Sequence, residues 1–173
     1  MNVLVELAPQ VKALAEEVCQ RCERAGVTLL AYCAYRSPQQ QAKLWRQSRT
    51  RAEVEAKAQK FRDRHLEVLA EILLGVGPQD GVLGQHVTRA ASGESWHQYH
   101  EAFDAVPLVG GKAMWNASAP QWQIYGRACR DSGLQWAGDW EQFREFPHAQ
   151  LRAGSNPLKM LTVGQVWEAM PRV

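Results

Sequence analysis

The chain has 173 residues, of which 46% are hydrophobic, so it can bury a core and is not a disordered protein. Its formal net charge is only +2, so the chain lacks the large basic excess of proteins that are attracted to nucleic acid, and we do not expect a nucleic-acid partner. The length is ordinary for one core, and we expect residues 1–173 to form a single domain.

No membrane segment or export signal is predicted. Residues 1–6 do not show the basic leader and long apolar run of a secretory signal peptide. No stretch reaches the roughly 18 consecutive apolar residues that span a bilayer. We therefore expect synthesis in the cytoplasm and no stable membrane insertion.

The first predicted elements are a helix that carries two cysteines and a strand. The helix begins near Pro9, which suits a first turn, and stops before Gly26. Residues 27–35 follow as the strand. Cys19 and Cys22 have the C-x-x-C spacing of a redox pair or a structural metal site. Because Cys22 also falls on the apolar stripe of the helix, we expect it to pack as a small hydrophobic residue instead.

A second helix is predicted to begin at Ser37 through a capping box. The Ser37 hydroxyl can accept a hydrogen bond from the backbone near Gln40, and the Gln40 side chain can reach back. Pro38 suits the first helical position. Arg36 then lies at a strand-to-helix junction, where side chains commonly face a cleft.

Residues 51–74 predict one long helix, because apolar side chains recur along one stripe among many charges. This stripe is expected to pack on the core, or else to border a substrate groove or a partner, and Gly75 ends the helix. Residues 75–93 are rich in glycine and predict a loop, so His86 is expected at the surface and not as a ligand. The stripe consists of Ala58, Phe61, His65, Val68, Leu69 and Ile72.

The second half of the chain predicts a buried strand that carries Asp104, and then a helix with an aromatic inner face. Trp122, Tyr125 and Cys129 are expected to point inward from that helix. In order, the predicted elements are a strand at 102–109, a helix at 120–132, an extended segment at 134–136 and a short helix at 161–170.

Two pairs of ionisable residues predict a metal site. His97 and Asp104 stand seven residues apart, and Glu145 and His148 form a second pair downstream. A metal that must also bind substrate needs about three nitrogen or oxygen ligands and one open position. His97, Asp104 and His148 supply that number, which leaves Glu145 to act as a base. Pro147 disfavours helix at the residue before it, so the second pair must meet through a turn or an irregular strand.

These motifs resemble the zinc peptidases that include D-Ala-D-Ala dipeptidases and carboxypeptidases and the phage L-alanyl-D-glutamate endolysins. The resemblance runs from about residue 25 to 151 and has a helical insertion near 49–75. It also rests on Tyr35-Arg36-Ser37-Pro38 with Gln41, on Gly93-Glu94-Ser95-Trp96-His97, and on Trp136-Ala137-Gly138-Asp139-Trp140.

The resemblance implies an α+β fold of the Hedgehog and D-Ala-D-Ala-peptidase kind, in which a small antiparallel sheet carries the zinc ligands and helices pack on its other side. It implies a monomer with one Zn²⁺ as cofactor, which would activate water and polarise the scissile carbonyl. Glu145 would be the general base and then the general acid. Arg36, Gln41 and Ser95 would bind the substrate, which is the peptidoglycan stem peptide.

Several alternatives remain at this point. Taken singly, Arg36 could be a structural ion-pair partner, Ser95 a turn residue and Gln41 a solvated helix residue. The favoured activity is hydrolysis of the L-Ala-D-Glu bond during host lysis, with access to the wall after holin-type release. A D,D-carboxypeptidase or dipeptidase is the enzyme alternative, and a non-catalytic wall-binding module is the other; the presence of Glu145 favours an enzyme.

His100 departs from the family pattern, which has glycine at this position. We therefore expect a backbone conformation there that does not require glycine. The side chain would line the cleft, assist the transition state, compete as a ligand or lie at the surface.

Overall fold

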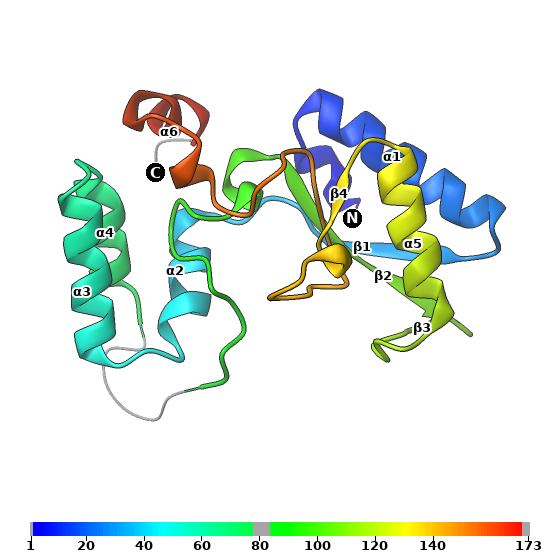
Figure 1. Cartoon of the computed structure of the whole chain (residues 1–173), viewed down its shortest axis with the longest axis horizontal. Coiled ribbons are helices and arrows are strands. Elements are labelled where there is room, and N and C mark those ends of the chain that lie inside the picture. The colour runs from blue at the N-terminus through cyan, green and yellow to red at the C-terminus, as the bar shows by residue number, and fades with distance from the viewer. Residues whose placement is uncertain (1, 78–83, 171–173) are drawn as a thin grey trace. The chain divides into compact units, whose positions relative to one another are not determined.

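The structure of the chain is a computed structural model that describes residues 2–77 and 84–170, and its fold is α+β (Figure 1). The described residues form two compact units, each built from two separate stretches of chain. The first unit contains residues up to 35 together with 100–153, and the second contains residues 36–99 together with those from 154 onward. The single domain over residues 1–173 stays a prediction.

The first unit is built on a small antiparallel sheet. Its strands follow the order β1-β2-β5-β4, and β3 pairs with the other end of β2 as a hairpin. β2 coincides with the predicted strand at 102–109. The strands are β1 (Thr28–Cys33), β2 (Ala102–Val109), β3 (Lys112–Ala113), β4 (Gln135–Trp136) and β5 (His148–Gln150).

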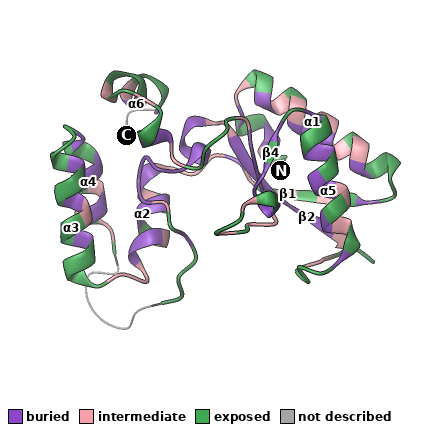
Figure 2. Ribbon diagram, in the orientation of Figure 1, coloured by how far each residue is buried: buried purple, intermediate pink, exposed green. Residues whose placement is uncertain are grey.

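Two helices, α1 (Pro9–Arg24) and α5 (Pro120–Asp131), pack on the sheet and on each other. Each has proline in its first turn, and their buried residues join the sheet in one apolar core (Figure 2). Trp122, Tyr125 and Cys129 point into this core as predicted. The short helices η1 (Val3–Glu6) and η3 (Ala137–Asp139) complete the unit.

Cys22 packs in the core, as expected from its place on the apolar stripe of α1. Its side chain has no solvent exposure, and burial raises the pKa of its thiol to about 12. A thiol that stays protonated is a poor metal ligand. None of the four cysteines, all of which lie in the described residues, forms a disulfide.

The second unit is helical, and several of its helices begin with local caps. The capping box predicted at Ser37 with Gln40 is formed, and Thr162 with Gln165 forms another. The elements are α2 (Pro38–Arg46), α3 (Arg51–Arg62), α4 (Glu67–Gly75), η2 (Trp96–Tyr99), η4 (Pro157–Lys159) and α6 (Val163–Ala169).

The single helix predicted over residues 51–74 is wrong, because the chain turns between α3 and α4. His65 adopts a left-handed backbone conformation at φ +58° in this turn, and its side chain is exposed instead of lying on the apolar stripe. The turn folds α4 back onto α3, so each helix covers the apolar side of the other. The buried residues are Val54, Ala58 and Phe61 of α3 with Leu69, Ala70 and Leu73 of α4.

Within residues 2–77 and 84–170, no helix combines the length and the apolar character that crossing a membrane requires.

Candidate metal and catalytic site

Three side chains with metal-ligating atoms stand in one row across the sheet of the first unit. Cys33 of β1 is paired with Asp104 of β2, and Asp104 is paired with His148 of β5. Residues paired directly across antiparallel strands point to the same face. We call Cys33, Asp104 and His148 the polar row. Their neighbours Phe103 and Ala105 alternate to the opposite face and belong to the core.

A β-bulge brings Cys33 into the polar row. Ala31 pairs with Ala105 and packs on the core, but Cys33 pairs with the next residue, Asp104, so Tyr32 is the extra residue. In a regular strand Ala31 and Cys33 would point to the same side, and the thiol would face the core. The bulge reverses that alternation. Cys33 is therefore absent from the predicted ligands, because regular strand periodicity would turn its side chain towards the core.

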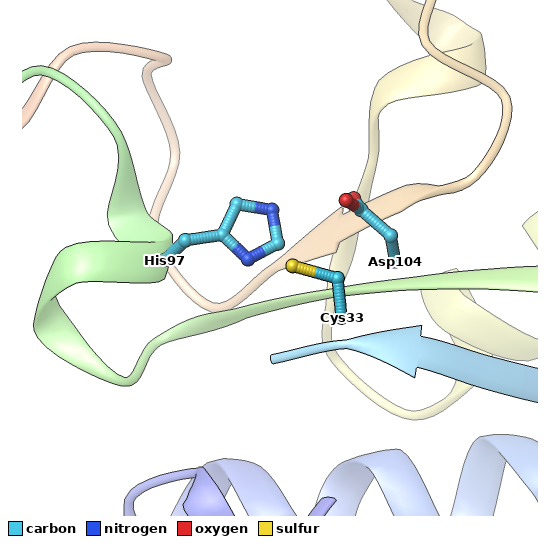
Figure 3. Close-up of side chains that lie close together, drawn as sticks. All are labelled: Cys33, His97 and Asp104. Carbon is cyan, nitrogen blue, oxygen red and sulfur yellow. The ribbon is translucent and has the colours of Figure 1, made fainter. Parts of the chain in front are cut away.

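Cys33 and Asp104 also belong to a group of potential ligands with His97, which lies in η2. One ligand atom from each of the three residues lies within 4.8 Å of the other two (Figure 3). His97 is 1% exposed and Asp104 8% exposed, so water does not screen these groups strongly. The three residues could hold a metal ion.

Asp104 also contacts the third predicted ligand, His148. The distance between Asp104 Oδ1 and His148 Nδ1 is 3.2 Å, and both side chains are buried. The other ring nitrogen, Nε2, lies 3.0 Å from Oε1 of Gln150. His148 itself is not in the group with Cys33.

Glu145 and His148 are joined by a tight turn, one of the two arrangements expected from Pro147. The His148 N–H donates to the Glu145 carbonyl over 3.1 Å, and the Glu145 N–H donates to the carbonyl of Ala137 over 3.2 Å. The backbone of the predicted base is therefore fixed at both sides. Residues 145–148 form the turn, and β5 begins at its last residue, His148.

Two buried aromatic side chains hold the same turn from the core. The Trp136 indole donates to the Phe146 carbonyl over 2.7 Å, and the Tyr125 hydroxyl donates to the Pro147 carbonyl over 3.0 Å. Burial raises the pKa of Tyr125 well above its ordinary value, so its hydroxyl keeps the proton that it donates. Both bonds end on residues between Glu145 and His148 and so orient them.

Trp136 can reach the turn because two glycines stand against its ring. A Cβ atom on Gly126 would lie 2.2 Å from the Trp136 ring, and so would a Cβ atom on Gly138. No real side-chain contact is that close. The Trp-Ala-Gly-Asp-Trp segment thus has a packing function: it seats the indole that fixes the turn before His148.

The predicted substrate residue Arg36 lies beside His97 in the second unit. The Arg36 N–H donates to the His97 carbonyl over 3.4 Å, and its guanidinium donates to Gln41 Oε1 over 2.9 Å. Gln41 has no solvent exposure, which excludes the solvated helix residue considered above. Its amide group donates to the Ala90 carbonyl over 2.6 Å. Gln41 therefore holds Arg36 in place, and substrate binding by either residue stays a prediction.

Ser95 and Glu94 fix the loop that carries His97. Ser95 is buried, and its carbonyl accepts from the Gln98 N–H over 3.1 Å at the start of η2. The Glu94 carboxylate accepts from Lys57 over 2.7 Å and from the Ala91 N–H over 3.0 Å. Ser95 thus lies in a turn, as the alternative of a purely structural turn residue expects. Its function in substrate binding stays a prediction.

The backbone at His100 is left-handed, a conformation that glycine favours but that histidine also adopts, so it does not require glycine. Its φ of +58° lies in the left-handed region that glycine favours, so this chain keeps the glycine-like backbone with a side chain on it. Two contacts offset the steric cost, which is about 1–2 kcal/mol. The ring Nδ1 lies 2.5 Å from the Glu6 carbonyl oxygen, and the ring stacks on Tyr35 with centroids 4.5 Å apart. His100 is not in the group of potential ligands.

Comparison with known proteins identifies the family of the chain through a family model. The Bacillus subtilis (strain 168) peptidoglycan L-alanyl-D-glutamate endopeptidase CwlK is 24% identical over 159 residues, which are 87% of this chain and 77% of CwlK. The L-Ala D-Glu endopeptidase ChiX of Serratia marcescens has 17% sequence identity, with 87% of this chain and 84% of ChiX covered and a TM-score of 0.44. The family model of the VanY D-alanyl-D-alanine carboxypeptidases matches residues 5–122, a stretch that contains Arg36, His97 and Asp104. The chain belongs to the VanY D-alanyl-D-alanine carboxypeptidase family.

Proposed function

We propose that the chain is a zinc-dependent peptidoglycan peptidase that hydrolyses the L-Ala-D-Glu amide of the stem peptide. Family membership supports a peptidase, and CwlK is named for this bond. The observation that carries the proposal is the closed turn at residues 145–148. It joins a carboxylate, Glu145, to an imidazole, His148, that contacts the buried Asp104.

The donor set fits zinc. Two zinc ligands at about 2.1 Å in a tetrahedral arrangement are separated by about 3.4 Å. The 3.2 Å between Asp104 Oδ1 and His148 Nδ1 is close to that spacing. His97, Asp104 and His148 would hold the ion, and one carboxylate with two neutral imidazoles leaves its charge partly uncompensated. When bound, zinc supplies a Lewis acid that polarises the scissile carbonyl and stabilises charge on its oxygen.

The chain's own residues would perform the proton transfers and the binding. Glu145 accepts a proton from the attacking water and passes it to the departing amine, a function that contributes about 10²–10⁴ in rate. Arg36, held by Gln41, binds a substrate carboxylate through two parallel charged hydrogen bonds. Ser95 and Gln41 would complete the binding of the peptide near the scissile bond.

Peptide-product analysis tests the proposed bond. Purified peptidoglycan is digested and the new termini are identified by mass spectrometry. We expect fragments with a new amino terminus at D-Glu, and we expect the activity to disappear with a chelator and to return with Zn²⁺. Release of D-Ala would instead assign the chain as a D,D-carboxypeptidase. Binding to the wall without any product would assign it as a wall-binding module.

The thiol of Cys33 is expected to make the site bind soft metal ions more strongly than the proposed nitrogen and oxygen ligands would do alone. A thiol beside Asp104 and His97 favours ions such as Cd²⁺, which bind sulfur strongly. We expect Cd²⁺ to give a sulfur-to-metal charge-transfer band that the Cys33→Ser substitution removes. The control, Cys19→Ser, changes a helix cysteine outside the polar row and should keep the band. Equal bands in both variants would show that Cys33 does not contact the metal.

A further inference from the structure

Gln150 is a buried polar residue that the proposed mechanism does not use. It lies in β5 two residues after His148, so the two side chains point to the same face of the sheet. Only 1% of Gln150 is exposed. Its backbone is fixed on both sides, because it pairs with Ala102 of β2 and with Gln135 of β4.

The amide of Gln150 has contacts at both of its ends. Its nitrogen, Nε2, lies 2.5 Å from the carbonyl oxygen of Arg152, and its oxygen, Oε1, lies 3.0 Å from Nε2 of His148. A backbone carbonyl only accepts hydrogen bonds, so the NH₂ end of the amide must face Arg152. A rotated amide would place two oxygen acceptors together. The Arg152 carbonyl therefore determines which end of the amide faces His148.

The orientation of the amide determines the tautomer of the imidazole. Because Gln150 Oε1 is an acceptor, the His148 nitrogen that faces it must carry the hydrogen. In a neutral ring, Nδ1 then has the lone pair, and this atom lies 3.2 Å from the carboxylate oxygen of Asp104. Two acceptors at that distance are stabilised by a cation between them.

We propose that Gln150 is a positioning residue that holds His148 in its Nε2–H tautomer and thereby presents Nδ1 to a divalent metal beside Asp104. The inference rests on the proposed function for the presence of the metal, and only on the two hydrogen bonds of the Gln150 amide for the tautomer. Residues that orient a metal-binding histidine in this way typically change metal affinity 10–100-fold when they are replaced.

The first test reads the tautomer in the metal-free full-length protein. Long-range ¹H–¹⁵N correlation spectra of ¹⁵N-histidine-labelled protein at about pH 8, where an ordinary imidazole is neutral, distinguish the two ring nitrogens. We expect His148 to carry its hydrogen on Nε2, and Gln150→Leu to raise the population with hydrogen on Nδ1. A wild-type ring with its hydrogen on Nδ1 alone would overturn the proposal.

The second test measures zinc affinity by competition with a chromophoric chelator. Gln150→Leu should bind Zn²⁺ about 10–100-fold more weakly, while Gln150→Glu, which keeps an acceptor for Nε2–H, should lose less. Gln123→Leu, on the exposed side of α5, is the matched control and should bind as the wild type does. If Gln150→Leu does not fold, Gln150→Glu and the wild-type spectrum still decide the question. Equal affinity in a folded Gln150→Leu protein contradicts the positioning function.

The two proposals fail separately. A wild-type protein with the expected tautomer but no hydrolysis of peptidoglycan would remove the proposed function and leave the assignment of Gln150 intact. A protein that hydrolyses the L-Ala-D-Glu bond but carries the His148 hydrogen on Nδ1 alone would support the proposed function and overturn the assignment of Gln150.

Discussion

Replacing Glu145 by glutamine is expected to lower the turnover of peptidoglycan by about 10²–10⁴, because an amide of the same shape cannot accept the proton. The fold should be unchanged, since glutamine has the same shape and the backbone hydrogen bonds that fix this residue remain. The zinc content should stay at about one ion per chain, because Glu145 is not among the three proposed ligands. Steady-state kinetics on purified wall and metal analysis of the same sample measure both quantities.

Glu141→Gln is the matched control for this substitution. Glu141 lies four residues earlier in the same segment and is exposed, and the change removes the same charge. We expect it to keep near wild-type turnover. If Glu145→Gln also left turnover intact, Glu145 would not be the base. If neither protein cut the wall but both bound it, the chain would be a wall-binding module.

Replacing Gly138 by alanine is expected to lower the free energy of unfolding by about 1–3 kcal/mol, the usual cost of overpacking a core. The added methyl group would lie 2.2 Å from the Trp136 ring, so the indole must move. Turnover should fall together with stability, because the same indole donates to the Phe146 carbonyl in the turn before His148. Urea denaturation and wall hydrolysis measure the two effects.

Gly75→Ala is the control for Gly138→Ala. A Cβ atom on Gly75 would meet nothing within 4 Å, so this substitution adds the same methyl group without a clash. We expect a change in unfolding free energy within about 0.5 kcal/mol. If both variants had the same free energy of unfolding, the close packing of Gly138 against Trp136 would not contribute to stability.

The elements that local signals specify were predictable from the sequence. The strand at 102–109 is one buried apolar segment, and the helix at 120–132 has proline at its start and aromatic residues on one side. The turn between α3 and α4 was not predictable, because no glycine or proline marks it. His65 takes the left-handed conformation there because packing of the two helices requires the chain to reverse.

The meeting of two predicted site residues follows from the sequence, but the contacts around them do not. Motif spacing singled out Asp104 and His148, which are 44 residues apart and meet in the sheet. Cys33 could not be found in this way, because the bulge that turns it towards Asp104 depends on the pairing of two distant strands. The contacts of Gln150 depend in the same way on the position of β5 between β2 and β4.

The polar row has a consequence for the timing of biosynthesis. Its three residues lie at positions 33, 104 and 148, and a ribosome makes them in that order. A nascent polypeptide that stops before residue 145 has neither the proposed base, Glu145, nor the second imidazole, His148, whatever else has already folded. Truncated translation products should therefore be inert towards the wall, and enzymatic competence would arise only when the last strand is inserted.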